Sequence, residues 1–253
     1  MKTIHLNQTD STNLYLERHL SELPEICSVR ADIQTAGRGR LSRQWDSAKG
    51  GLWFSVLFKT PTLSPFQLQK VCSLATLKSL KRELELTTKT IVPIEKSPSP
   101  EPFLLKWPND IYYNSKKISG CLQKNILSST ASNCIIGVGV NINNPLPEEL
   151  IKKAINLKTI LSKEIDVEQL YHHISENIER RLSDFSQEEL EENYKKHLLI
   201  KEGVHVKVLD IVNNNHYTGR VMGYPGETLE IFTEEGLQLS FKAADVTLKS
   251  WED

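Results

Sequence analysis

Two polar clusters in this 253-residue chain combine the residue types that bind anions in proteins. The first is QTAGRGRLSRQW, residues 34–45, which mixes arginines with glycines and lacks the apolar periodicity of a helix or a strand. Glycine permits open or left-handed backbone, and the planar guanidinium group matches carboxylate and phosphate. We therefore predict a loop that holds an anionic ligand, with a solvated basic turn as the alternative. Its key positions are Gly37, Arg38, Gly39, Arg40 and Arg43.

Trp45 follows the arginines directly and adds an aromatic face to the predicted loop. A flat indole beside cationic groups could contact the ring of a nucleotide while the arginines contact its phosphates. The alternative is a core tryptophan that begins the next strand.

The second cluster is KWPNDIYYNSKKISG, residues 106–120. Pro108 cannot donate to a strand ladder, so we expect a strand to end here and Asn109 and Asp110 to project from the turn. A carboxylate near lysines can help to hold Mg²⁺ or orient an amine, and a lysine can neutralise phosphate. Neither cluster has the GxxxxGK[ST] spacing of a P-loop. The polar members of this cluster are Lys106, Asn109, Asp110, Lys116 and Lys117.

The elements that would position both clusters can be outlined from periodicity. Possible capping residues at 10–12 and leucines at helical spacing predict a helix near the N-terminus. Residues 26–33 and 51–58 read as strands joined by the arginine loop. Ser64-Pro65 starts a helix that should end near Leu86.

The central part of the chain favours a sheet. FLLKW, DIYY, KISGCLQKNIL and NCIIGVGVNI are strand-like runs separated by short turns, which predicts an antiparallel meander. The proline-rich residues 87–102 read as an exposed excursion without an assigned function. From Pro147 to Leu199 the pattern is helical, with capping-box spacing at Asp166 and Ser186.

The pattern changes near residue 200 to short strands separated by turn residues, typical of a small barrel of about 50 residues. We therefore predict two domains, residues 1–200 and 201–253.

Composition excludes several classes of protein. Lysine and arginine total 31 against 32 acidic residues, so a basic surface must be local rather than general. The longest apolar runs are too short for a membrane helix, and the N-terminus lacks the apolar core of a signal peptide. The four cysteines have no CxxC spacing, which disfavours structural zinc and disulfides. We expect a soluble, cytoplasmic protein.

Taken in order, GRGRLSRQW, KWPND, KISG and GVGVNIN resemble the motifs of biotin protein ligases, which attach biotin to a carboxyl carrier protein. The resemblance extends from Asp10-Ser11-Thr12-Asn13 to the C-terminal barrel. It implies an α+β fold: a mixed-sheet catalytic domain of the biotin/lipoate ligase type, followed by a small SH3-like barrel.

The resemblance also implies roles for individual residues. It places Lys117, Arg40 and Asp110 in catalysis. Contacts with biotin are implied for Ser11, Thr12, Asn13, Gln34, Gly37, Arg38, Gly39, Arg40, Lys117 and Gly120. Contacts with the nucleotide are implied for Arg38, Arg40, Trp45, Lys106, Asn109, Asp110 and Asn141. It assigns no protein ligands to a metal ion.

Three positions depart from the family pattern. Leu41-Ser42 stands where the family continues with an arginine and a glycine. Cys121 replaces an aliphatic residue, and we interpret it as a packing residue. The proline-rich excursion before KWPND is longer than expected.

The implied reaction uses ATP and Mg²⁺ to convert biotin into biotinyl-5′-AMP and then transfers biotin to a lysine of a biotin carboxyl carrier protein, such as an acetyl-CoA carboxylase subunit. A homodimer is possible. One alternative is a lipoate ligase with the same adenylation chemistry. The other is a biotin-sensing repressor, but only ten residues precede Ser11 and no general basic surface is present, so we expect neither a nucleic-acid nor a membrane partner.

Overall fold

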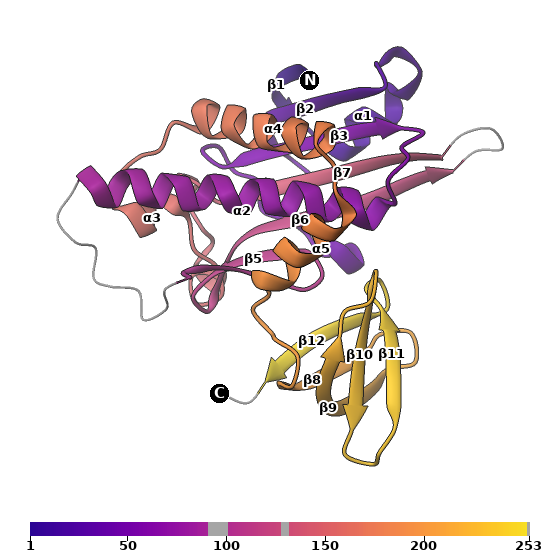
Figure 1. Ribbon diagram of the computed structural model, residues 1–253. Helices are drawn as coiled ribbons and strands as arrows, with labels where there is room; N and C mark the ends of the chain where they lie inside the picture. Colours follow the sequence, from indigo (N-terminus) through magenta and orange to yellow (C-terminus); the bar gives the residue numbers. More distant parts are fainter. Residues whose placement is uncertain (91–100, 128–131, 252–253) are drawn as a thin grey trace. The chain divides into compact units, whose positions relative to one another are not determined.

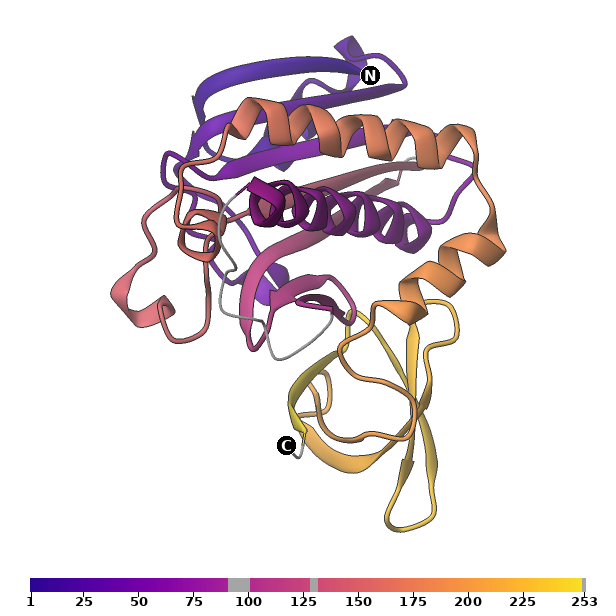
Figure 2. The same cartoon turned by 60° about the vertical axis from the view of Figure 1, so that its left-hand side comes forward.

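The computed structural model describes residues 1–90, 101–127 and 132–251. The chain divides into two compact units (Figures 1 and 2). The first contains Met1–Leu105 and Asn109–His197, and the second contains Lys106–Pro108 with Leu198–Asp253.

The first unit is built on a mixed seven-stranded sheet of order β1-β2-β3-β7-β6-β5-β4 (Figure 1). β1 pairs in parallel with β2, whereas β2–β3, β3–β7, β7–β6 and β6–β5 are antiparallel. The strands β4 to β7 are neighbours in the sheet, and their antiparallel β5–β6 and β6–β7 pairs confirm that part of the predicted meander. The strands are β1 (Lys2–Thr9), β2 (Ile26–Gln34), β3 (Leu52–Lys59), β4 (Phe103–Lys106), β5 (Asp110–Tyr113), β6 (Lys116–Leu127) and β7 (Ser132–Val140).

Helices cover both faces of this sheet. In Figure 2, α2 (Pro65–Thr90) and α4 (Val167–Ser183) run side by side over one face. Cys121 points to this face, because its Sγ accepts a hydrogen bond from Ser73 of α2 at 3.3 Å. Successive strand residues point to opposite faces, so Gly120 belongs to the other face, the one that carries α1 (Thr12–Arg18). Cys121 is 2% exposed and packs as predicted.

Three of the described helices, α3 (Leu157–Leu161), α4 and α5 (Gln187–Lys196), begin at a side-chain cap. Asp166 Oδ1 accepts the Gln169 N–H at 3.0 Å, and Ser186 Oγ accepts the Glu189 N–H at 3.3 Å. These caps confirm the two capping predictions. The other helical elements are η1 (Leu20–Glu22), η2 (Arg40–Ser42) and η3 (Glu148–Leu150).

Several boundaries differ from the predictions. β1 was missed, and α2 continues to Thr90 rather than ending near Leu86, because no proline or glycine interrupts it earlier. Residues 91–100 of the predicted excursion lie outside the described residues. Asp110 does not project from a turn: it is the first residue of β5, after the cis Trp107–Pro108 bond.

The second unit contains a five-stranded antiparallel sheet of order β11-β10-β9-β8-β12, as expected for an SH3-like barrel. Alternating buried residues such as Val206, Val208, Leu229 and Ile231 form its core. Four of its strands were predicted, and β12 was not. The strands are β8 (His205–Asp210), β9 (Asn215–Gly223), β10 (Thr228–Thr233), β11 (Gln238–Lys242) and β12 (Val246–Trp251). None of the helices in the described ranges is long and apolar enough to cross a membrane.

Candidate active site

A chain of buried polar groups lies where α1 meets the sheet. Gln34 Oε1 accepts the Thr12 N–H at 2.9 Å and is 3.1 Å from Thr12 Oγ1. Thr12 Oγ1 is in turn 2.6 Å from Ser55 Oγ in β3, and Ser55 donates to Asn13 Oδ1 at 2.5 Å. Thr12, Asn13 and Ser55 are each at most 7% exposed. The structure therefore brings three predicted biotin contacts together around a serine that was not predicted.

Two residues fix the start of α1. Ser11 is the N-cap and is 4% exposed, and its N–H donates to Asp10 Oδ1 at 2.7 Å. Arg18 donates to both Asp10 oxygens, at 2.6 and 2.8 Å. The hydrogen bond from Arg18 holds the pKa of Asp10 well below its usual range. Asp10 thus stays ionised and anchors the first turn, which carries Ser11 and Thr12.

Lys117 and Asp110 form an ion pair over Gly120, with Nζ and Oδ1 2.7 Å apart. The pair is not aligned as a hydrogen bond, and Oδ1 has no hydrogen-bond donor among the described residues. A Cβ at Gly120 would lie 2.9 Å from Asp110 Oδ1 and 3.1 Å from Lys117 Nζ. Glycine is therefore required for the two charged groups to meet above the sheet.

A β-bulge turns Lys117 toward this site. Ile111 pairs with Ser119, but Tyr112 pairs with Lys117, so Ile118 is an extra residue in β6. Without the bulge, Lys117 and Gly120 would point to opposite faces, because they are three residues apart.

Trp45 lies against β7 with Lys117 above its ring. Lys117 Nζ is 4.7 Å from the ring centroid, and a Cβ at Gly139 would be 2.8 Å from Cε2 and Nε1 of the indole. The Nε1 group is buried without a hydrogen-bond partner among the described residues. Because β3 begins only at Leu52, Trp45 does not start that strand. The alternative interpretation, a core tryptophan that begins the next strand, was therefore wrong.

Of the loop arginines, Arg40 forms a side-chain hydrogen bond with a predicted site residue, whereas Arg38 does not. Arg40 Nη1 donates to Asn109 Oδ1 at 3.4 Å. Burial lowers the pKa of Arg40, with an opposing effect from Asp110 and a further lowering from Arg43. Arg38 is exposed, and no described residue forms a hydrogen bond or an ion pair with its side chain. Leu41 has a φ of 58°, a left-handed conformation that favours glycine.

The predicted polar contacts of the nucleotide are held by backbone hydrogen bonds. Asn109 Nδ2 donates to Cys121 O at 2.6 Å, and the Asn141 N–H donates to Ile118 O at 2.9 Å. Asn109 and Asn141 are 8% and 5% exposed. Lys106 lies in the second unit, so its role at this site stays a prediction.

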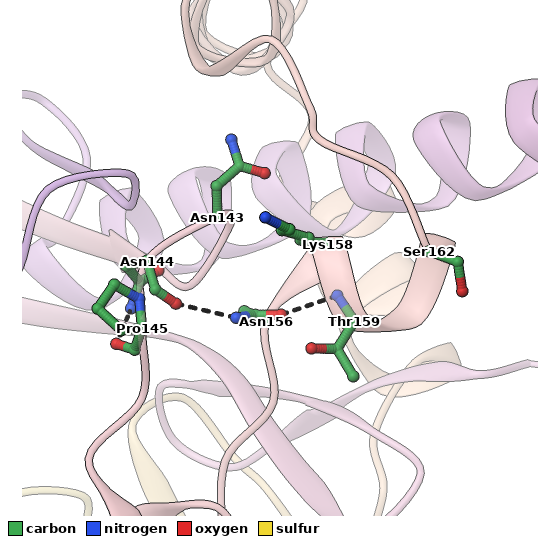
Figure 3. Close-up of a pocket in the computed structure, with 7 residues that line it drawn as sticks. All are labelled: Asn143, Asn144, Pro145, Asn156, Lys158, Thr159 and Ser162. Atoms are coloured by element: carbon green, nitrogen blue, oxygen red, sulfur yellow. Dashed lines mark hydrogen bonds between the residues drawn. The ribbon is translucent and has the colours of Figure 1, made fainter.

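A pocket of 560 Å³, lined mostly by polar residue types, follows β7 (Figure 3). In it, Asn156 Nδ2 donates to Asn144 O at 2.9 Å, and Asn144 Nδ2 donates to Asn141 Oδ1 at 3.3 Å. None of the predicted site residues lines this pocket, but Asn144 connects it to Asn141. Its lining residues are Asn143, Asn144, Pro145, Asn156, Lys158, Thr159 and Ser162.

Sequence reasoning missed Ser47 and Ser55. Gln34 Nε2 donates to Ser47 Oγ at 2.8 Å, and Ser47 donates to Trp45 O at 3.2 Å, which links the two groups of site residues. The signal for Ser55 was a lone hydroxyl within the apolar run LWFSVLF. Gly137 was quoted without a role, yet a Cβ there would be 2.4 Å from Asn13 Oδ1.

Comparison with known proteins assigns the chain to a class. Residues 5–141, more than half of the chain, match the biotin/lipoate A/B protein ligase family, and the chain belongs to this family.

Two individual members are similar over more of the chain, and a third over about the same share. A biotin protein ligase from Aquifex aeolicus, solved with biotin and ATP, is 32% identical with a TM-score of 0.76, and the alignment covers 98% of both chains. The bifunctional ligase/repressor BirA of Bacillus subtilis is 29% identical over 237 residues, which are 89% of this chain and 67% of that protein. The biotin–[acetyl-CoA-carboxylase] ligase of Paracoccus denitrificans is 29% identical over 140 residues, 54% of this chain and 53% of that one.

Proposed function

We infer that this chain is a ligase that activates biotin with ATP and transfers it to a protein lysine. One observation carries this inference: a likeness over 98% of the chain to a ligase solved with biotin and ATP. The site has matching chemistry, because Lys117, Asp110 and Trp45 bring a cation, a carboxylate and an indole together, and Ser47 links Trp45 to Gln34.

The first step joins two anions. An oxygen of the biotin carboxylate attacks the α-phosphorus of ATP, the bond to the β-phosphate oxygen breaks, and pyrophosphate leaves. In this proposal Lys117, which pairs with Asp110, and Arg40, which donates to Asn109, would offset the repulsion between carboxylate and phosphate. Lys117 must partly leave Asp110 to do so, and the two groups are held as an ion pair without an aligned hydrogen bond. Arg38, which is exposed, would contribute after the loop closes on the ligand.

Mg²⁺ is proposed as the cation that accompanies ATP. The described residues contain no cluster of three metal-ligating side chains. This fits Mg²⁺ in nucleotide sites, where phosphates and water supply most ligands and the protein supplies one or two oxygens. The side-chain oxygens of Asn141 and Asp110 are the candidates here, and the ion would neutralise phosphate charge.

The second step transfers the acyl group. The ε-amine of the acceptor lysine attacks the carbonyl of biotinyl-5′-AMP, the carbon–oxygen bond to phosphate breaks, and AMP leaves. The amine loses a proton, which passes to solvent as the amide forms, and Asp110 Oδ1, 2.7 Å from Lys117 Nζ and without a hydrogen-bond donor among the described residues, is the candidate for orienting the amine. We propose that Asp110 orients this amine and that the acceptor is a biotin carboxyl carrier protein, as the name of the Paracoccus relative suggests.

Further expectations accompany this proposal. We propose domains of residues 1–200 and 201–253, a cytoplasmic location, a possible homodimer, and no nucleic-acid partner, since charges nearly cancel over the whole chain.

The test is acceptor labelling. The protein would be incubated with ATP, Mg²⁺ and either biotin or lipoate, together with a biotin carboxyl carrier domain or a lipoyl domain. We expect biotin on the carrier domain alone, and none on a carrier whose target lysine is replaced by arginine. Labelling of the lipoyl domain with lipoate, in the absence of biotin transfer, would favour the lipoate ligase alternative.

A further inference from the structure

The buried polar chain at α1 has three oxygen–oxygen contacts but fewer hydrogen atoms to bridge them. It runs Gln34 Oε1, Thr12 Oγ1, Ser55 Oγ, Asn13 Oδ1, with separations of 3.1, 2.6 and 2.5 Å. Amide oxygens only accept, so the two hydroxyl groups supply all the hydrogens. Two hydrogens cannot bridge three contacts, so one pair of oxygens has no hydrogen between them.

The orientations of both amides are fixed by other groups. Gln34 Oε1 must face Thr12, because it accepts the backbone N–H of that residue at 2.9 Å. Asn13 Nδ2 faces Leu122 O at 3.4 Å, and a backbone carbonyl can only accept. Rotating either amide would place two acceptors or two donors against each other. The shortage of hydrogens is therefore a property of the site.

The distances show which contact lacks a hydrogen. Oxygen atoms 2.5 and 2.6 Å apart require a hydrogen between them. The 3.1 Å between Thr12 Oγ1 and Gln34 Oε1 is longer than the usual oxygen–oxygen distance of an O–H···O hydrogen bond. Thr12 thus donates to Ser55, and Ser55 donates to Asn13. Thr12 Oγ1 and Gln34 Oε1 are left facing each other with lone pairs and no hydrogen.

We propose that Ser55 is a positioning residue that sets the specificity of the head-group site: by accepting the Thr12 hydrogen, it makes Thr12 and Gln34 a pair of acceptors for ligand N–H groups. A cyclic urea, the head group of biotin, has two such N–H groups, whereas a dithiolane ring has none. This inference rests on the proposed biotin ligase function. Ser55 is 0% exposed, so it acts through Thr12 and not by touching the ligand.

The neighbouring strand supports this placement. Ser55 pairs with Gly137 in the β3–β7 register, and Gly137 is the residue whose missing Cβ leaves room for the Asn13 carboxamide. Asn13 is therefore held where it can accept the Ser55 hydrogen.

The test separates binding from chemistry. In Ser55→Ala, Thr12 loses its acceptor and can donate to Gln34 Oε1, so a ligand N–H must displace that bond. We expect KM for biotin to rise about 10- to 100-fold, with kcat and KM for ATP within about twofold of wild type. Desthiobiotin, which keeps the urea, should be weakened equally. Ser175→Ala is the control: the Ser175 hydroxyl is also buried but, unlike that of Ser55, has no hydrogen-bond partner among the described residues. KM for biotin should be unchanged in this variant.

A double mutant tests the route through Thr12. Thr12→Val removes the hydroxyl at constant shape, so adding Ser55→Ala to it should change KM for biotin by no more than about twofold. The proposal would be overturned if the increases in KM for biotin of the two single variants multiplied in the double mutant. It would also be overturned if Ser55→Ala left KM for biotin unchanged, or lowered only kcat. If Ser55→Ala does not fold, Ser55→Cys, a weak acceptor of similar shape, should give an intermediate KM, and a wild-type KM there would overturn it. Failure of the wild-type protein to use biotin would instead refute the proposed function.

Discussion

Replacing Lys117 with alanine should remove most of the first chemical step while leaving the fold intact. Its ammonium lies 2.7 Å from Asp110 Oδ1 and 4.7 Å from the centroid of the Trp45 ring. Loss of one donor to developing negative charge costs roughly 2.7–4 kcal/mol, or about 100- to 1,000-fold in rate. Asp110 Oδ1 is buried and would lose its cation, so we expect about 1–3 kcal/mol of lost stability, which leaves the chain folded.

Biotin-dependent exchange of pyrophosphate into ATP measures this step without an acceptor protein. Lys116→Ala is a matched control, because the neighbouring lysine donates to Ile151 O at 2.9 Å and not to the site. We expect near-normal exchange in that control. Folded Lys117→Ala protein with exchange within about threefold of wild type would refute the argument for Lys117.

Three further predictions concern the loop and the head-group site. Arg40→Gly removes a clamp on the mixed anhydride, and biotin labelling of a bystander such as albumin should rise about ten- to a hundredfold; unchanged labelling with adenylate still made would contradict this role. Gly137→Ala adds a Cβ 2.4 Å from Asn13 Oδ1, so biotin affinity measured by calorimetry should fall at least tenfold, and unchanged affinity would show that Asn13 can move freely. Saturating biotin should slow tryptic cleavage within residues 37–45, because a ligand anion offsets the repulsion between the arginines; equal rates would argue against loop closure.

Local motifs predicted the main parts of the site because each lies in one short segment. The arginine loop and the polar cluster at residues 106–120 were identified from residue types and spacing, whereas the role of Gly120 came from the family resemblance. The structure brings Asp110, Lys117 and Gly120 together. The mixed sheet and the small C-terminal barrel were expected from the strand patterns and the family resemblance.

Other features could not be predicted because they depend on distant residues. β1 has the alternating residues Ile4 and Leu6, but only its pairing with β2 makes it a strand. The bulge at Ile118 depends on the register between β5 and β6. Ser55 acquires its role only because folding places α1 over β3.

Leu41 illustrates a different limit. Its position was recognised as a departure from the family pattern, but the sequence does not give its φ of 58°. A leucine in this conformation costs about 1 kcal/mol relative to glycine, so local hydrogen bonds such as Gly39 N–H to Arg43 O at 2.7 Å must hold the turn.

The central claim is that this site makes biotinyl-5′-AMP, and mass spectrometry of the adenylate tests it most directly. Wild-type protein would be incubated with ATP, Mg²⁺ and equal concentrations of biotin and lipoate, without an acceptor. The acyl-adenylate recovered from the protein should carry biotin, and Lys117→Ala should yield far less of it. Recovery of lipoyl-AMP in preference to biotinyl-5′-AMP, or of no acyl-adenylate from folded wild-type protein, would contradict the account.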